Sequence, residues 1–340
     1  MIKPAPKGKD AYEFKPSEEF NNYIITERGT DKIGVLFAGN KAVRLFKSVK
    51  DGLLQGTILI GKISEIQTNI NAAFVLTDGR TKCFLPLNFY RKEANLTACR
   101  EPKCGDNILI EIVRCASKGK LAGARCTVES IDKFRDVAMH RTEYSVLKNG
   151  EDCVNDFLYS EDEIRPDRVL TDIPEAYDEL ISHFGEAANA PEIHLYRDDL
   201  VSLSVLYSLE KVIADALNRK VWLKSGGYIC IEPTEALTVI DVNSGKYDKK
   251  TADDDTYFNL NIESFDEILR QMSLRNLSGI IIIDFIKLKN KEKQQKLLDY
   301  MRTSADKYDS AVKIVDLTKL GLAELTRLKK GRTIYEQFLV

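Results

Sequence analysis

The sequence predicts an α+β protein of several parts, with an all-β barrel in its first half and an α/β layer at its C-terminal end. Residues 52–128 hold five short segments of alternating apolar and polar residues, separated by turn signals such as Asp78-Gly79. This pattern is typical of a small closed barrel. Residues 216–340 instead alternate apolar strands with stretches of helical apolar spacing. That alternation favours a mixed or mostly parallel sheet covered by helices.

The first 51 residues are expected to form a tail and a small sheet. Residues 1–20 are charged and contain prolines but lack the apolar stretch of a secretory signal, so we expect a mobile tail. Residues 21–51 alternate apolar and polar positions between glycine and asparagine turns, which predicts a short antiparallel meander. The barrel that follows, at residues 52–128, has the size and strand number of an oligonucleotide-binding barrel.

The second half of the chain divides at about residue 215. Residues 129–215 mix acids and bases with helical apolar spacing and are broken by prolines, so we expect helices joined by loops. In residues 216–340 we expect a hairpin that turns at Ser225-Gly226-Gly227 and helices over 256–276 and 291–308. Strands are expected in EALTVIDVNSG, SGIIIIDFI and VKIVDLT. A chain of 340 residues can bury two or three such cores.

The composition excludes several classes of protein. Seven cysteines without a CxxC pattern and only three histidines argue against a disulfide framework or a zinc site. No apolar run reaches the length of a membrane helix, so we expect a cytoplasmic protein with reduced thiols. A net charge of −2 argues weakly against a nucleic-acid partner. The stretch from Arg114 to Arg125, however, contains four basic residues and no acid.

Two aspartates have the sequence context of metal ligands. Asp241 lies at the end of an apolar strand, and Asp284 directly follows four isoleucines near the end of another. A carboxylate in such a strand is costly to desolvate unless it binds a cation or a partner, and Mg²⁺ prefers oxygen ligands. Asn243 is placed to orient Asp241 as a neighbouring amide. Capping of a loop or helix is the alternative, and these residues alone leave the two interpretations about equally supported.

Aromatic and basic residues in the barrel are candidates for contact with single-stranded RNA. Phe74 and Phe84 fall on neighbouring predicted strands, and stacked bases with phosphates near positive charge are what such RNA requires. The basic candidates are Lys62, Arg114, Lys118 and Lys120. For each phenylalanine separately, a place in the barrel core is the alternative. Trp222 is expected to pack within its hairpin. Arg327, Lys329 and Lys330 are expected to form a solvated basic face.

Long stretches of the sequence closely resemble the ribonuclease E/G family. The resemblance runs nearly unbroken from Leu217 to Arg327 and includes RKVWLKSGGYICIEPTEALTVIDVNSG, SGIIIIDFI and LGLAELTR. Upstream, GTILIGKISEIQTNINAAFVLTDGRTKCFLPL resembles the S1 RNA-binding barrel of that family. Similarity is much weaker in residues 21–51 and 129–215. The resemblance is specific where order, spacing and rare local combinations all agree.

The resemblance implies a fold in which an S1 (OB-type) barrel at 52–128 is inserted in a ribonuclease-H-like scaffold formed by 21–51 and 129–215. A DNase I-like catalytic subdomain, 216–340, follows. The implied activity is magnesium-dependent endonucleolytic cleavage of single-stranded RNA, with Mn²⁺ as a substitute metal. Asp241 and Asp284 match the family's metal ligands and Asn243 its orienting asparagine. Phe74 and Phe84 match the aromatic residues that stack on RNA.

Four departures from the family pattern qualify this expectation. The 5′-phosphate sensor that normally follows the barrel is missing or reduced in residues 129–215, and the sequence ends at Val340 before any CPxC zinc link. We therefore expect no structural zinc, and a homodimer only without a zinc bridge. Ala122 stands where the family has a lysine, with Lys118 and Lys120 as substitutes. Lys287 stands where the family's IDFID motif has its second aspartate.

The sequence is also compatible with two alternative functions. An RNA-binding protein with lost or weak catalysis would be consistent with the shortened sensor region, although the intact aspartate pair argues against it. A phosphohydrolase acting on DNA or small phosphates would not need the aromatic and basic barrel face. RNA processing or decay is therefore the function that the sequence favours.

Overall fold

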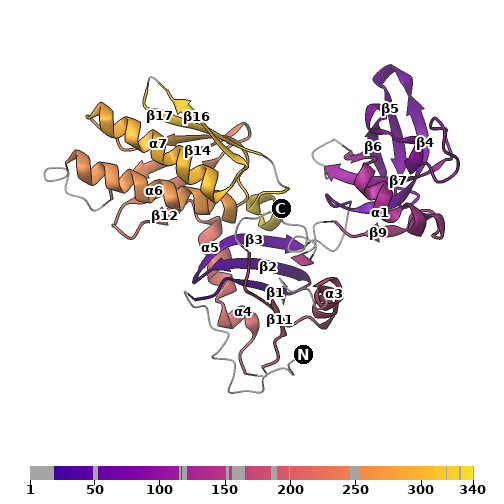
Figure 1. Ribbon diagram of the computed structural model, residues 1–340, viewed down its shortest axis with the longest axis horizontal. Coiled ribbons are helices and arrows are strands. Elements are labelled where there is room, and N and C mark those ends of the chain that lie inside the picture. The colour runs from indigo at the N-terminus through magenta and orange to yellow at the C-terminus, as the bar shows by residue number, and fades with distance from the viewer. Residues whose placement is uncertain are drawn as a thin grey trace. The chain divides into compact units, whose positions relative to one another are not determined.

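The computed structural model describes residues 19–48, 53–114, 116, 121–150, 153–154, 165–184, 190–198, 200–245, 253–318, 320–328 and 331–339. The chain forms two compact units, of which unit 1 combines Met1–Lys47 with Glu161–Val340 and unit 2 is Ser48–Ser160. Residues 1–18 of the expected tail lie outside the described residues. The described residues form a mixed α+β structure with three sheets (Figure 1).

Unit 2 is built around a closed five-stranded barrel, which confirms the predicted barrel. Its strands are β4 (Ile58–Gln67), β5 (Ala72–Leu76), β6 (Lys82–Pro86), β7 (Asn107–Arg114) and β8 (Ala122–Arg125). They neighbour one another in the order β5-β6-β8-β7-β4, and β4 pairs again with β5. Each strand therefore has two partners and no barrel edge is left unpaired. Strand β9 (Val146–Lys148) is added outside β4, and helix α1 (Val128–Met139) packs on the barrel core.

Alternation along the strands fills the barrel. Val75, Cys83 and Leu85 are fully buried, whereas Phe74, Leu76 and Phe84, their neighbours on the same strands, are only partly buried. Gly61 of β4 is required by this interior, because a Cβ there would lie 2.4 Å from Val75 Cγ1. The described part of unit 2 also contains the short 3-10 helices η2 (Thr68–Ile70), η3 (Leu87–Phe89) and η4 (Lys92–Ala94).

The first sheet of unit 1 has the order β11-β10-β1-β2-β3. Its strands are β1 (Asn22–Arg28), β2 (Asp31–Ala38), β3 (Lys41–Ser48), β10 (Arg168–Thr171) and β11 (Glu192–Leu195). β1 runs antiparallel to β2 and parallel to β10, which in turn is parallel to β11. The segment 129–215 was expected to be helical, yet it contributes β9, β10 and β11. These strands have three or four residues each, too few for a period-two pattern to stand out.

The second sheet of unit 1 contains the two strands that carry Asp241 and Asp284. Its strands are β12 (Lys220–Trp222), β13 (Tyr228–Pro233), β14 (Leu237–Asn243), β15 (Gly279–Asp284), β16 (Val312–Leu317) and β17 (Leu322–Arg327). Their order is β12-β13-β14-β15-β17-β16, and β14 and β15 are parallel while the other pairs are antiparallel. The sheet is thus mixed. β17, in the LGLAELTR stretch, lies between β15 and β16 although it follows both in the chain.

Helices α6 (Asp254–Leu274) and α7 (Lys291–Tyr308) lie side by side over one face of this sheet (Figure 1). Their apolar sides pack against Ile240, Ile281 and Ile283 in one buried cluster. Asp253 and Asn290 cap the N-termini of the two helices through side-chain oxygens that accept backbone hydrogen bonds. The other described helices are α3 (Pro174–Phe184), α4 (Leu203–Leu206), α5 (Leu209–Leu217) and α8 (Ile334–Phe338).

The helices give no sign of a membrane span. Among the described residues, none of them combines the length and the apolar character needed to cross a bilayer.

Candidate active site

Asp241 and Asp284 are direct neighbours across the one parallel strand pair of the second sheet. The register of β14 and β15 pairs Ile240 with Ile283 and Asp241 with Asp284. Partners in register on adjacent strands lie about 5 Å apart and point to the same face. Both aspartates are exposed, whereas Ile240 and Ile283 are buried against α6 and α7 on the opposite face. The two carboxylates therefore share the open face of the sheet.

Asn243 holds the Asp241 carboxylate. Its Nδ2 donates a hydrogen bond of 2.7 Å to Asp241 Oδ2. The two residues are two positions apart on β14 and share a face of the sheet, so the bond requires no distortion of the strand. One oxygen of Asp241 is thereby oriented and the other stays available to a ligand.

Two glycines bring the β12–β13 turn against the end of β14. Gly245 has a φ of +58°, and a Cβ at this position would lie 2.2 Å from the carbonyl oxygen of Gly226. A Cβ on Gly227 would lie 2.7 Å from Leu260 Cδ1 and 3.0 Å from the carbonyl oxygen of Asn243. Only glycine fits this close approach of two backbones. The SGG turn and the NSG segment of the sequence are therefore one structural unit that fixes the backbone of Asn243.

The residues present fit a magnesium site of the kind that shares a cation with a phosphate. Mg²⁺ keeps several waters and needs only one or two protein carboxylates when substrate oxygens supply further ligands. Asp241 and Asp284 provide two such carboxylates side by side on an accessible face. The described residues contain no group of three or more histidine, cysteine or acidic side chains arranged as a metal site.

The acidic triplet at residues 253–255 has a structural role instead. The Asp253 side chain accepts a hydrogen bond from the backbone N–H of Thr256, and hydrogen bonds to Thr256 hold its pKa below the ordinary value. Asp254 accepts from the backbone N–H groups of Lys289 and Asn290, which likewise lowers its pKa. These contacts tie the start of α6 to the loop that follows β15, close in sequence to Asp284.

The two phenylalanines stand together on the outside of the barrel. Phe74 of β5 and Phe84 of β6 are paired in register, and their ring centroids lie 5.9 Å apart in an edge-to-face arrangement. Both are partly exposed, whereas Val75 and Cys83 point into the core. Arg114 follows in the same row, because Phe84 pairs with Gly123 and Gly123 with Arg114.

Lys82 adds a positive charge that we had not singled out from the sequence. Its Nζ lies 5.9 Å from the centre of the Phe74 ring. Lys82 is two residues before Phe84 on β6, so strand alternation was the signal that could have placed it on this face. Lys62 forms an ion pair of 2.9 Å with Glu143, which raises the pKa of the lysine.

The remaining basic candidates are only partly placed. Lys118 and Lys120 lie outside the described residues, and so do Lys329 and Lys330 of the expected basic face. Ala122, at the family's lysine position, is buried with its side chain in the barrel core. Lys287 is exposed in the loop after β15. The prediction for Arg327 was wrong, since this side chain is 5% exposed and donates a hydrogen bond of 2.8 Å to Asp309.

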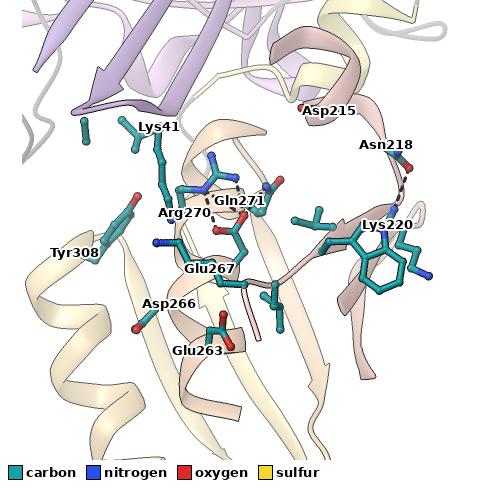
Figure 2. Close-up of a pocket in the computed structure, with 16 residues that line it drawn as sticks. Lys41, Asp215, Asn218, Lys220, Glu263, Asp266, Glu267, Arg270, Gln271 and Tyr308 are labelled. Carbon is teal, nitrogen blue, oxygen red and sulfur yellow. Dashed lines mark hydrogen bonds and ion pairs between the residues drawn. The ribbon is translucent and has the colours of Figure 1, made fainter. Parts of the chain in front are cut away.

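A cavity of about 740 Å³ lies elsewhere in unit 1, lined in part by Lys41, Lys220, Glu263, Glu267 and Arg270 (Figure 2). Burial opposes ionisation of Glu267, but hydrogen bonds from Arg270 and Gln271 outweigh it and hold its pKa below the ordinary value. Arg270 also donates to the backbone carbonyl of Ala42, which ties α6 to β3. Glu267 and Arg270 are thus paired with each other, and neither Asp241 nor Asp284 lines the cavity.

Comparison with known proteins gives a consistent family assignment. Ribonuclease E of Synechocystis is 37% identical over 205 residues, which are 59% of this chain and 30% of the relative. Ribonuclease G of Escherichia coli K12 is 38% identical over 193 residues, or 56% of this chain and 38% of the relative. Ribonuclease G of Salmonella typhimurium is 45% identical over 134 residues, or 39% of this chain and 27% of the relative.

The aligned part of the chain thus spans less than two-fifths of the length of each of these relatives. The family model described as "Ribonuclease E/G family" matches residues 119–330, well over half of the chain. That match contains Asp241, Asn243 and Asp284 but begins beyond Phe74 and Phe84. The chain therefore belongs to the ribonuclease E/G family.

Proposed function

We propose that this chain is a magnesium-dependent endoribonuclease that hydrolyses phosphodiester bonds in single-stranded RNA, with the metal held by Asp241 and Asp284. The observation that carries the proposal is the register of β14 and β15, which places the two carboxylates side by side on an open face. Membership of the ribonuclease E/G family supports the choice of RNA as the partner.

The proposed chemistry divides between the metal and the side chains around it. When bound, Mg²⁺ would supply Lewis-acid chemistry at the phosphate, and the residues of the site would hold it and position the RNA. Asp241 and Asp284 would hold the ion, and the amide of Asn243 orients the Asp241 carboxylate toward it. Mn²⁺, which accepts similar oxygen ligands, is expected to substitute.

The barrel is proposed to hold the RNA strand. Phe74 and Phe84 offer ring faces and edges to bases, and Lys82, Arg114 and Lys62 supply positive charge for phosphates. Lys118 and Lys120 remain candidates for the same role. This assignment is supported by the position of the two phenylalanine rings, which lie on the outside of the barrel beside basic residues and not in the barrel core.

We also propose how the parts correspond to the family fold. The closed barrel of unit 2 supports its assignment as an S1-type domain. The first sheet joins the meander β1 to β3 to the parallel strands β10 and β11, which supports its assignment as a ribonuclease-H-like scaffold. Unit 2 interrupts this scaffold between β3 and β10. The mixed sheet with α6 and α7 on one face supports a DNase I-like catalytic subdomain over residues 216–340.

The decisive test replaces each aspartate with its uncharged isostere. Asp241→Asn and Asp284→Asn should each lower the rate of cleavage of a fluorescent single-stranded RNA by roughly 10³-fold, because the several kcal/mol that a metal supplies to the transition state are lost. Binding of the RNA, followed by anisotropy, should be little changed. Asp306→Asn is the matched control, since Asp306 is exposed on α7, in the helical layer that covers the opposite face.

Two outcomes would redirect the proposal. Cleavage that persists in both variants would place the reaction elsewhere. Binding by the wild-type chain without any product across a magnesium titration would favour the alternative, an RNA-binding protein of the same fold without catalysis.

A further inference from the structure

An aromatic cluster with a lysine lies at the edge of the sheet that carries the carboxylate pair. The cluster consists of Lys220 and Trp222 on β12 and Tyr228 on β13, and we call it the Trp222 cluster. The Trp222 and Tyr228 ring centroids lie 5.2 Å apart. Lys220 Nζ lies 3.9 Å from the centre of the Trp222 ring and 3.6 Å from that of Tyr228. The ammonium group thus holds both rings through cation–π contacts.

Strand register places the Trp222 cluster on the same face as the carboxylates. Lys220 pairs with Cys230, which pairs with Asp241. Trp222 pairs with Tyr228, which pairs with Asn243. Two strand spacings, or roughly 10 Å, therefore separate β12 from β14, which carries Asp241, and three separate it from β15, which carries Asp284. A nucleic-acid strand bound at the carboxylates passes within reach of the indole.

Trp222 is more exposed than hairpin packing requires. Its packing against Tyr228 agrees with the expectation from the sequence, yet 56% of the residue remains exposed. An edge strand needs no tryptophan for its backbone pairing, and a large exposed aromatic side chain beside a lysine is what a binding surface for single-stranded nucleic acid contains. Every base has a face that can stack on such a ring, so binding at this surface does not depend on the RNA sequence.

We propose that Trp222 stacks with a base of the RNA strand held at Asp241 and Asp284, and that Lys220 fixes the ring and supplies positive charge beside it. This inference rests on the proposed function and adds a substrate-positioning residue to the same face. Hairpin packing alone is the competing role, and the experiments below separate the two.

Trp222 is the single tryptophan of the chain, so its fluorescence reports on this position alone. In the full chain carrying Asp284→Asn, titration with a labelled single-stranded RNA should quench the tryptophan emission in step with binding measured by the anisotropy of the label. The bound RNA should also shield the indole from acrylamide. An oligonucleotide of abasic ribose-phosphate units should bind more weakly and leave the emission unchanged. Complete binding by anisotropy with unchanged emission and unchanged acrylamide access would overturn the proposal.

Substitution gives an independent readout in the cleaving enzyme. Trp222→Ala should raise KM for single-stranded RNA by about tenfold or more with a small change in kcat, and Trp222→Tyr should restore most of the affinity. Val315→Ala is the matched control, because Val315 is 53% exposed on β16, the opposite edge strand. Equal KM values for Trp222→Ala and wild type would overturn the proposal. If Trp222→Ala unfolds the sheet by circular dichroism, the quenching experiment in the Asp284→Asn background decides alone.

The two proposals fail in different ways. Persistence of cleavage in Asp241→Asn and Asp284→Asn removes the proposed function. Loss of cleavage in those variants, together with an unresponsive Trp222, removes only the stacking role.

Discussion

At the scale of single residues, Asn243 shows how a neighbouring side chain can orient a proposed metal ligand. Its amide binds one oxygen of Asp241, and its own backbone is fixed by the approach of the glycine turn to the end of β14. Side chains that orient a metal ligand typically contribute 10- to 100-fold to metal affinity or activity, without touching the ion themselves.

We therefore expect Asn243→Ala to raise the magnesium concentration for half-maximal cleavage by roughly 10- to 100-fold. The rate should recover in part at saturating magnesium, because Asp241 and Asp284 are still present. A magnesium titration of the cleavage rate measures both effects. Asn290→Ala serves as the control, since it removes the amide that caps α7 and should lower stability without changing the magnesium requirement. An unchanged half-saturation point in Asn243→Ala would contradict the orienting role.

At the scale of elements, one carboxylate organises the loop between η4 and β7 of the barrel. Asp106 is 3% exposed and accepts hydrogen bonds from both terminal nitrogens of Arg100 at 2.7 Å, from Asn95 Nδ2 at 2.9 Å and from the backbone N–H of Lys103 at 2.8 Å. Burial by itself raises the pKa of Asp106, but these hydrogen bonds outweigh it and lower the pKa below the ordinary value.

The lowered pKa makes the stability of unit 2 depend on pH in a definite direction. The Asp106 carboxylate contributes fully above its unfolded pKa of about 3.9, and the contribution is lost as pH falls through the lower folded value. Asp106→Asn should reduce the free energy of unfolding by about 2 kcal/mol at neutral pH, with the difference from wild type shrinking below about pH 4. Urea unfolding at a series of pH values tests this, with the exposed Asp136→Asn of α1 as the control. A constant difference at all pH values would refute the assignment.

At the scale of the whole molecule, one continuous unit interrupts another. Unit 2 is one stretch of chain, whereas unit 1 is assembled from segments on either side of it. The first sheet shows this directly, because β1 pairs with β10 across the interruption. Unit 2 has its own apolar core and a barrel whose strands are all paired.

Residues 48–160 should therefore fold when expressed alone. We expect the far-ultraviolet circular dichroism of a β protein and a single cooperative unfolding transition. Weak binding of single-stranded RNA, reduced by Phe74→Ala, would accompany folding if the proposed aromatic face is correct. An unfolded product would show that the barrel depends on contacts from the rest of the chain.

Local patterns in the sequence were sufficient for much of the second sheet. The period of apolar residues predicted helices at 256–276 and 291–308. The first range lies within two residues of the bounds of α6, and the second has the same bounds as α7. The runs around Asp241 and Asp284 predicted strands that end at or near these aspartates. β15 ends at Asp284, and β14 continues two residues past Asp241 to Asn243. The barrel was likewise predicted from five alternating segments and their turns. These features depend on neighbouring residues in the chain, which a single sequence displays.

The tertiary structure alone decided which strands become neighbours. It paired Asp241 with Asp284, inserted β17 between β15 and β16, and turned Phe74 and Phe84 to the outside of the barrel. It also buried Arg327, whose charge suggested a solvated face. Strand partners and buried faces are set by contacts between segments far apart in the chain, which no local period encodes. The sequence by itself thus determined the two strand-end aspartates and the family, and tertiary pairing made the two aspartates a single candidate site.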